Sequence, residues 1–208
     1  MTSDLLPNSA DALLFDLGRV VLDIDFSKAL ASWAGHAGCQ PTDLAERFVR
    51  DEAYEYHEVG KIDDAAYFQS LRGSLGIGIL DAQFLEGWNA IFAGEMPGIA
   101  PLLKRAAARL PLYAFSNTNR PHVEHFSIAY ADVLGHFSEL FLSSAIGLRK
   151  PDAAAYDYVV KAIGVPAKRI VFFDDLAANI EGARARGLTA VHVTSPEDVA
   201  QALAALGI

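Results

Sequence analysis

The sequence predicts an α/β fold: a doubly wound parallel sheet with a helical segment inserted near its start. Three observations predict this class. Through the second half of the chain, short apolar runs alternate with longer segments of helical periodicity, which is the pattern of βαβ units. A similar apolar run stands alone near the N-terminus, at 12–16. Between them, from about 24 to 96, apolar residues recur at helical spacing and no strand pattern is expected.

Each predicted strand is a run of four to six mostly apolar residues, as expected for parallel strands buried on both faces. The predicted strands are 12–16, 111–116, 139–143, 169–174 and 189–193. The helices predicted in the second half are 98–109, 121–130, 152–163, 177–186 and 196–206. Pro121 and Pro151 fall where the first turn of a helix tolerates a missing N–H group.

The inserted segment predicts a small helical lid on the sheet domain. Its helices are expected in "FSKALASWAGHAG", "PTDLAERFVRDEAYEYHEVG", "DDAAYFQSLRGSLG" and "DAQFLEGWNAIFAG", with Gly or Pro at the breaks. We therefore predict a core domain made of 1–23 and 97–208 and a cap made of 24–96. Trp33 and Trp88 stand at helical spacing and are expected to pack inside the cap.

Composition excludes several classes of function. The formal charge of −9 disfavours nucleic acid or an anionic membrane as the main partner, because both attract clustered Lys and Arg. Neither a signal peptide nor a membrane span is expected. Cys39 is the single cysteine, so an intrachain disulfide is excluded and a cytoplasmic location is expected. The sequence leaves both a monomer and a homodimer open.

Polar side chains follow three of the predicted strands and precede one of the helices. They are Asp16, Ser116 with Asn117, Asp174 with Asp175, and Lys150 within "GLRKPD". Alone, each is ordinary turn or capping chemistry. Because parallel strands deliver their carboxyl ends to one edge, the joint placement predicts a single polar crevice there.

These side chains fit phosphoryl transfer. A carboxylate at position 16 could take a phosphoryl group as an aspartyl-phosphate, provided that the charge of the phosphate is neutralised. Asp174 and Asp175 offer the hard oxygen ligands that Mg²⁺ prefers. Ser116 and Lys150 would hold the remaining phosphate oxygens.

Four segments, taken in order, resemble the motifs of the haloacid dehalogenase superfamily of phosphohydrolases: "FDLGRV", "FSNTN", "LRKPD" and "VFFDDLAANIEGA". The resemblance implies a Rossmann-like core with an α-helical cap and a Mg²⁺-dependent phosphoric monoester hydrolase. It implies that Asp16 is the nucleophile, that the Gly18 carbonyl with Asp174 and Asp175 serves the Mg²⁺ site, and that Ser116, Asn117 and Lys150 hold the phosphate. More narrowly, "DLGRVVLDIDF" and "SNTNRPH" resemble the bacterial subgroup that includes α-D-glucose-1-phosphate phosphatase.

Gly18 departs from this pattern. Most phosphatases of the superfamily carry there a second aspartate that protonates the leaving alcohol, a function worth on the order of a hundred- to ten-thousand-fold in rate. We expect a leaving group that needs less help, such as the anomeric oxygen of a sugar 1-phosphate. Four residues are weighed as replacement acids and read as structural: Asp23, Asp25, His57 and Glu58. Arg19 is read either as a phosphate or substrate contact or as a solvated residue at the cap entrance.

Substrate choice is expected to lie in the cap, with His57 and Glu58 of "YEYHEVG" as the candidate contacts. Three functions stay open. The first is a Mg²⁺-dependent phosphatase of a small phosphorylated metabolite, such as a sugar phosphate. The second is a 2-haloacid dehalogenase, which uses a similar aspartate without a metal, although the retained Asp174–Asp175 pair disfavours it. The third is a binding module of this fold without catalysis.

Overall fold

The computed structural model describes residues 5–208 and contains a five-stranded parallel sheet in the order β5-β4-β1-β6-β7. Its strands are β1 (Ala12–Phe15), β4 (Leu112–Ser116), β5 (Glu139–Leu142), β6 (Ile170–Asp174) and β7 (Thr189–His192). The predicted fold class and the five predicted strands are therefore confirmed. The first four residues of the predicted core segment 1–23 lie outside the described part of the chain.

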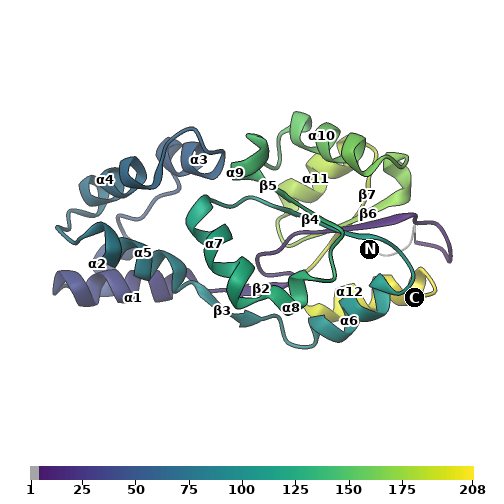
Figure 1. Ribbon diagram of the computed structural model, residues 1–208, viewed down its shortest axis with the longest axis horizontal. Helices are drawn as coiled ribbons and strands as arrows, with labels where there is room; N and C mark the ends of the chain where they lie inside the picture. The colour runs from purple at the N-terminus through teal and green to yellow at the C-terminus, as the bar shows by residue number, and fades with distance from the viewer. Residues whose placement is uncertain (1–4) are drawn as a thin grey trace.

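Helices cover both faces of the sheet (Figure 1). α6 (Ile99–Ala107), α7 (Arg120–Ala129), α8 (Ala131–Leu134) and α12 (Pro196–Ala205) pack on one face, in a hydrophobic cluster with Phe15. α10 (Ala153–Ile163) and α11 (Ala177–Ala185) pack on the other, in a cluster with Phe172. The short helices α9 (Ser143–Ile146) and η1 (Ala167–Arg169) precede α10 and β6. This double covering explains why the strands are apolar throughout.

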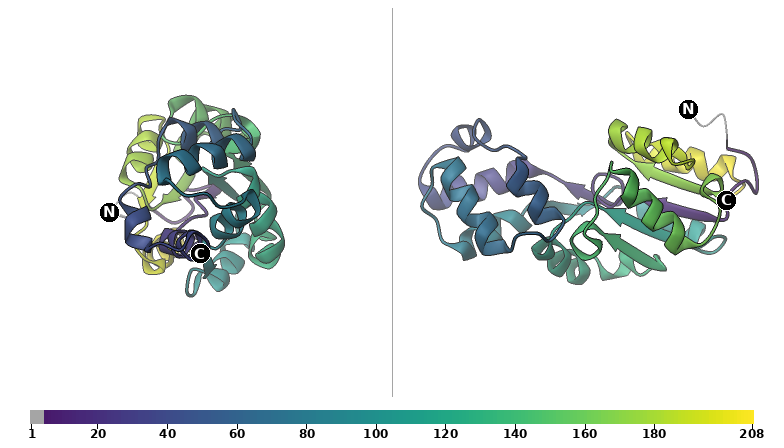
Figure 2. Two further views of the ribbon diagram at one scale, coloured as in Figure 1. Left: turned by 90° about the vertical axis from the view of Figure 1, so that its left-hand side faces the viewer. Right: turned by 90° about the horizontal axis from the view of Figure 1, so that it is seen from above.

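The inserted helices form a lobe of their own beside the sheet (Figure 2). They are α1 (Phe26–Ala37), α2 (Pro41–Ala45), α3 (Glu52–Glu58), α4 (Asp64–Leu75) and α5 (Asp81–Asn89). Trp33 and Trp88 are completely buried in this lobe and their rings stack at 5.9 Å, so both pack its interior, as the sequence predicted. We call these five helices the helical lobe.

The prediction of helices alone between 24 and 96 is wrong at both ends of the segment. β2 (Leu22–Ile24) and β3 (Phe92–Glu95) pair in an antiparallel ribbon, with an irregularity between Asp23 and Ile24. Strands of three and four residues carry too few alternating positions to be distinguished from the adjoining helical pattern. The ribbon is the double connection between the helical lobe and the sheet domain.

The prediction that Pro151 lies in the first turn of a helix is also wrong. α10 begins at Ala153, with Asp152 as its N-cap residue, so Pro151 precedes the helix. Pro121 is the second residue of α7 and fits the expectation.

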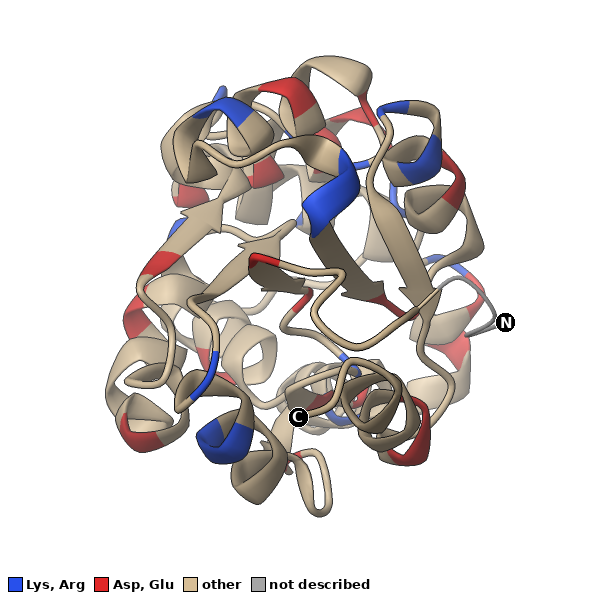
Figure 3. Cartoon of the chain, turned by 90° about the vertical axis from the view of Figure 1, so that its right-hand side faces the viewer, with Lys and Arg blue, Asp and Glu red and all other residues tan. Residues whose placement is uncertain are grey.

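Among residues 5–208, no helix is both long and apolar enough to cross a bilayer. On the side of the molecule seen in Figure 3, Lys and Arg are interspersed with Asp and Glu.

Candidate active site

The carboxyl ends of β1, β4 and β6 open into a cavity of about 180 Å³ between the sheet domain and the helical lobe. The predicted site residues that line it are Asp16, Gly18, Arg19, Glu58, Ser116, Asn117, Lys150 and Asp175. Asp174 lies behind this lining and is fully buried. His57 lines a separate cavity. The sheet topology brings together the predicted residues of the sheet domain, and α3 of the helical lobe adds Glu58 but not His57.

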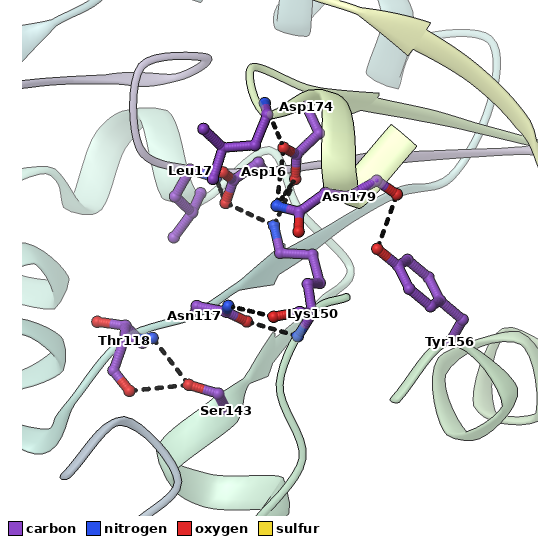
Figure 4. A network of polar contacts seen from close by, with 10 residues as sticks. Asp16, Leu17, Asn117, Thr118, Ser143, Lys150, Tyr156, Asp174 and Asn179 are labelled. Carbon is purple, nitrogen blue, oxygen red and sulfur yellow. Dashed lines mark hydrogen bonds and ion pairs between the residues drawn. The ribbon is translucent and has the colours of Figure 1, made fainter. Parts of the chain in front are cut away.

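Lys150 is the central cation of the site, and its side chain is 1% exposed. Its Nζ lies 3.0 Å from Asp16 Oδ1 and 2.7 Å from Asp174 Oδ2, so it links β1 to β6 (Figure 4). Burial alone would lower the pKa of Lys150, but the two carboxylates raise it above its ordinary value. The ammonium is therefore charged when it meets a ligand.

Asn117 sets the position of Lys150. Its side-chain amide donates to the Lys150 carbonyl at 2.8 Å, and its Oδ1 accepts from the Lys150 backbone N–H at 2.8 Å (Figure 4). This pair of bonds fixes the backbone of residue 150 against the end of β4. In this structure, Asn117 contributes to the site mainly by holding Lys150.

Asp174 and Asp175 have different surroundings. Both oxygens of Asp174 accept from the Asn179 side-chain amide, at 2.9 and 3.0 Å, and Oδ1 also accepts from the Leu176 N–H at 2.9 Å. Asp175 instead faces the cavity, and its pKa is raised by burial and by Asp174. Asp175 is therefore the more available of the two carboxylates for a ligand.

The residues present fit a divalent cation. Asp16, Asp174 and Asp175 each offer an oxygen, and these oxygens all lie within 4.8 Å of one another. Burial, together with the two neighbouring carboxylates and against the pull of Lys150, raises the pKa of Asp16 to about 7. The three carboxylates carry more negative charge than Lys150 can balance. Hard anionic oxygens of this kind are the donors that Mg²⁺ prefers.

The place of a side chain at position 18 is taken by Ile24 of β2. A Cβ atom added to Gly18 would lie 2.9 Å from Ile24 Cδ1. The next residue, Arg19, has a φ of 59°, in the left-handed region that non-glycine residues seldom adopt. Its side chain is 70% exposed and lies 4.0 Å from Asp175. The position that would hold a proton donor is thus walled by an aliphatic side chain.

The four residues weighed as replacement acids differ in their exposure and in their hydrogen-bond partners. Asp25 is the N-cap of α1 and accepts from the Ser27 N–H and hydroxyl at 2.9 and 2.6 Å. Asp23 is exposed on β2. The His57 ring stacks on Tyr67, and its Nε2 lies 2.9 Å from Asp64 Oδ1. Glu58 lines the cavity, and burial raises its pKa.

Several cavity residues have no signal in the sequence. Arg149 lies directly before Lys150, yet its partners Glu55 and Glu58 are more than ninety residues away along the chain. The side chains of Phe26, Arg50 and Tyr54 also line the lobe side, with the Arg50 guanidinium 4.9 Å from the centre of the Phe26 ring. Helical periodicity places such residues on a helix face but does not say what they meet across the connection.

Comparison with known proteins gives related phosphatases. "Phosphatase MT3486" of Mycobacterium tuberculosis is 33% identical over 191 residues, which cover 88% of this chain and 86% of that protein. "D-ribitol-5-phosphate phosphatase" of Bacteroides thetaiotaomicron is 24% identical over 178 residues, covering 81% and 84%. The "Drimenol cyclase drtB" of Aspergillus calidoustus is 34% identical over 102 residues, which are 49% of this chain and only 19% of the cyclase.

A solved structure has the same fold. It is a haloacid dehalogenase family enzyme of Bacteroides thetaiotaomicron in complex with magnesium and inorganic phosphate, with a TM-score of 0.79 at 23% identity, covering 89% of this chain and 95% of that one. The family model for haloacid dehalogenase-like hydrolases matches residues 10–187, which include the helical lobe and the sheet domain up to the end of α11. The chain therefore belongs to the haloacid dehalogenase-like hydrolase family.

Proposed function

We propose that this hydrolase is a Mg²⁺-dependent phosphatase that acts on a small phosphorylated metabolite through an aspartyl-phosphate at Asp16. The observation that supports this most is the buried array of Asp16, Lys150 and Asp174 beside the cavity-facing Asp175. Family relatives named as phosphatases agree with it.

Asp16 is proposed as the nucleophile, because it lines the cavity while its Oδ1 is oriented by the Leu17 N–H at 2.7 Å and by Lys150. Its carboxylate would attack phosphorus and form the acyl phosphate as the P–O bond to the leaving group breaks. Ser116, 6% exposed at the end of β4, and Lys150 would hold phosphate oxygens. Water would then hydrolyse the acyl phosphate and release inorganic phosphate.

Asp16, Asp175 and the Gly18 carbonyl would hold the metal ion, with Asp174 as a further ligand or as the group that orders Lys150. When bound, Mg²⁺ would neutralise phosphate charge, so that one anion can approach another. The excess of carboxylates over cations around Asp16 supports this assignment.

We further propose that the leaving group is a sugar, with the phosphate on its anomeric oxygen. Gly18 offers no proton donor, and its nearest neighbour is the aliphatic Ile24, so an alkoxide that is stable without protonation is favoured. On the lobe side, the rings of Phe26 and Tyr54 and the guanidinium of Arg50 provide the mixed apolar and hydrogen-bonding lining that suits a sugar.

The test is hydrolysis of p-nitrophenyl phosphate with and without Mg²⁺, beside an Asp16→Asn variant and a 2-chloropropionate control. We expect metal-dependent phosphate release and a loss of at least about a thousandfold in kcat for Asp16→Asn. Chloride release without metal would instead indicate a 2-haloacid dehalogenase, and no reaction would indicate a binding module. Glucose 1-phosphate should then be hydrolysed in preference to glucose 6-phosphate, and the opposite preference would contradict the proposed leaving group.

A further inference from the structure

The C-terminal end of α3 is one place where the helical lobe docks on the sheet domain by polar contacts. The Ser143 hydroxyl, at the start of α9, donates to the Glu58 carbonyl at 2.6 Å. Gly60 has a φ of 68°, and a Cβ atom added to it would lie 2.9 Å from the Ser144 carbonyl oxygen. The two backbones approach too closely there for a side chain at position 60.

Beside this contact, Arg149 of the sheet domain reaches the side chains of the same helix. Its Nε and Nη2 lie 3.1 and 2.9 Å from Glu58 Oε2, and its Nη1 lies 2.8 Å from Glu55 Oε1. The Glu58 side chain is 7% exposed and the Glu55 side chain is 51% exposed. An exposed pair contributes little, whereas breaking a buried pair leaves an uncompensated charge in a region of low dielectric. The Glu58–Arg149 pair is thus the energetically important one.

Arg149 is joined to Lys150 by one peptide bond, and the carbonyl and N–H of Lys150 are both held by Asn117. Lys150 Nζ in turn contacts Asp16 and Asp174. The segment 149–150 therefore has its first side chain fixed to the helical lobe and its second to the proposed nucleophile. A change in how α3 docks on the sheet domain would therefore displace Lys150, because one peptide bond joins it to Arg149.

We propose that Arg149 and Glu58 are positioning residues that hold Lys150 in its phosphate-binding place when α3 is docked on the sheet domain. The inference rests on the proposed phosphatase function and adds to it a link between the helical lobe and the phosphate-binding cation. Both side chains line the cavity, so the pair also closes the wall beside the substrate. Neither residue takes part in the bonds that form or break.

The experiment compares Arg149→Met, Glu58→Gln and the double variant, with Glu55→Gln as the matched control, because Glu55 binds the same Arg149 from the same helix. We expect kcat/KM to fall about ten- to a hundredfold in each single variant, the size of one lost charge-assisted contact. The fall should be equal for p-nitrophenyl phosphate and for a sugar phosphate, and the double variant should lose no more than a single one. Glu55→Gln should stay within about twofold of the parent protein.

Two further measurements keep the inference separate from the proposed function. The affinity for inorganic phosphate in the presence of Mg²⁺, measured by calorimetry, should weaken in Arg149→Met, and this readout needs no turnover. Arg149→Lys and Glu58→Asp keep the charges and should recover part of the lost kcat/KM. Such a recovery would show that the losses in Arg149→Met and Glu58→Gln do not come from misfolding. A protein that neither hydrolyses nor binds phosphate would overturn both proposals.

Losses confined to the sugar phosphate would overturn the inference alone, because Glu58 would then be a contact of the leaving group. Additive losses in the double variant, or unchanged phosphate affinity in Arg149→Met beside an active parent protein, would overturn it as well.

Discussion

At the core end of the cavity, Asp16, Lys150 and Asp174 are held by partners from different strands and loops, whereas the lobe end is lined mainly by aromatic and aliphatic side chains. The core end is buried, charged and almost fully hydrogen-bonded. Among its lining residues, which include Ile24 and Phe26, the lobe end has the buried ion pair Glu58–Arg149. The contrast suggests that the chemistry is set by the sheet domain and that the leaving group is selected under the helical lobe.

The largest expected effect tests how strongly the core end depends on its cation. Lys150→Met removes the ammonium and leaves Asp16 and Asp174 facing one another, so we expect the free energy of unfolding to fall by about 3–5 kcal/mol. Urea denaturation at pH 7 measures it. The control is Arg186→Met, which breaks the exposed pair with Asp157 and should cost less than about 1 kcal/mol. Similar costs for the two variants would contradict the view of the core end as a tightly coupled charge array.

The second prediction restores the proton donor that position 18 lacks, beside Ile24 at the lobe end. Gly18→Asp, made together with Ile24→Val to remove the Cδ1 atom that blocks the site, should raise kcat/KM for a simple alkyl phosphate by about ten- to a hundredfold. The reference protein is Ile24→Val alone. The rate with p-nitrophenyl phosphate should change little, because its leaving group needs no proton. Equal changes with both substrates would show that Gly18 does not determine leaving-group preference.

The third prediction concerns another polar contact between the helical lobe and the sheet domain. His122 of α7 is 5% exposed, and its Nε2 lies 2.9 Å from the Trp88 carbonyl oxygen. Burial lowers its pKa from 6.5 to about 3, so the folded protein keeps His122 neutral where the unfolded chain binds a proton. Stability from this group is therefore complete above about pH 6.5 and is lost as the pH falls toward 3, by roughly 1 kcal/mol per unit.

His122→Gln removes this dependence while it keeps a polar group at the same place. The free energy of unfolding of the variant, followed from pH 7 to pH 4, should fall less steeply than that of the parent protein. Parallel curves would mean that His122 is not held neutral in the folded state.

The core end was predictable from the sequence because its residues follow recognisable strands. Asp16, Ser116 and Asp174 each end an apolar run, and parallel topology brings such ends together, so their proximity follows from the fold class alone. The residues that hold these side chains in place are harder to predict from the sequence. Asn179, which binds both oxygens of Asp174, is the third residue of α11 and carries no signal of its own.

The lobe end was not predictable to the same degree, because its contacts join segments far apart in the chain. Ile24 lies beside position 18 because the turn from Leu17 to Leu22 folds β2 back, and β2 and β3 are too short to show a period. Glu58 and His57 are neighbours in α3, and the sequence indicates both equally as candidate substrate contacts. The turn of the helix sends Glu58 to the cavity and His57 toward Tyr67.

The most direct measurement is a crystal structure of the protein with Mg²⁺ and beryllium fluoride, a mimic of the phosphoryl group. We expect the fluoride adduct on the Asp16 carboxylate, with Lys150 Nζ beside it and a metal ion against Asp16 and Asp175. A structure with neither metal nor adduct next to Asp16, from crystals that contain both reagents, would contradict it.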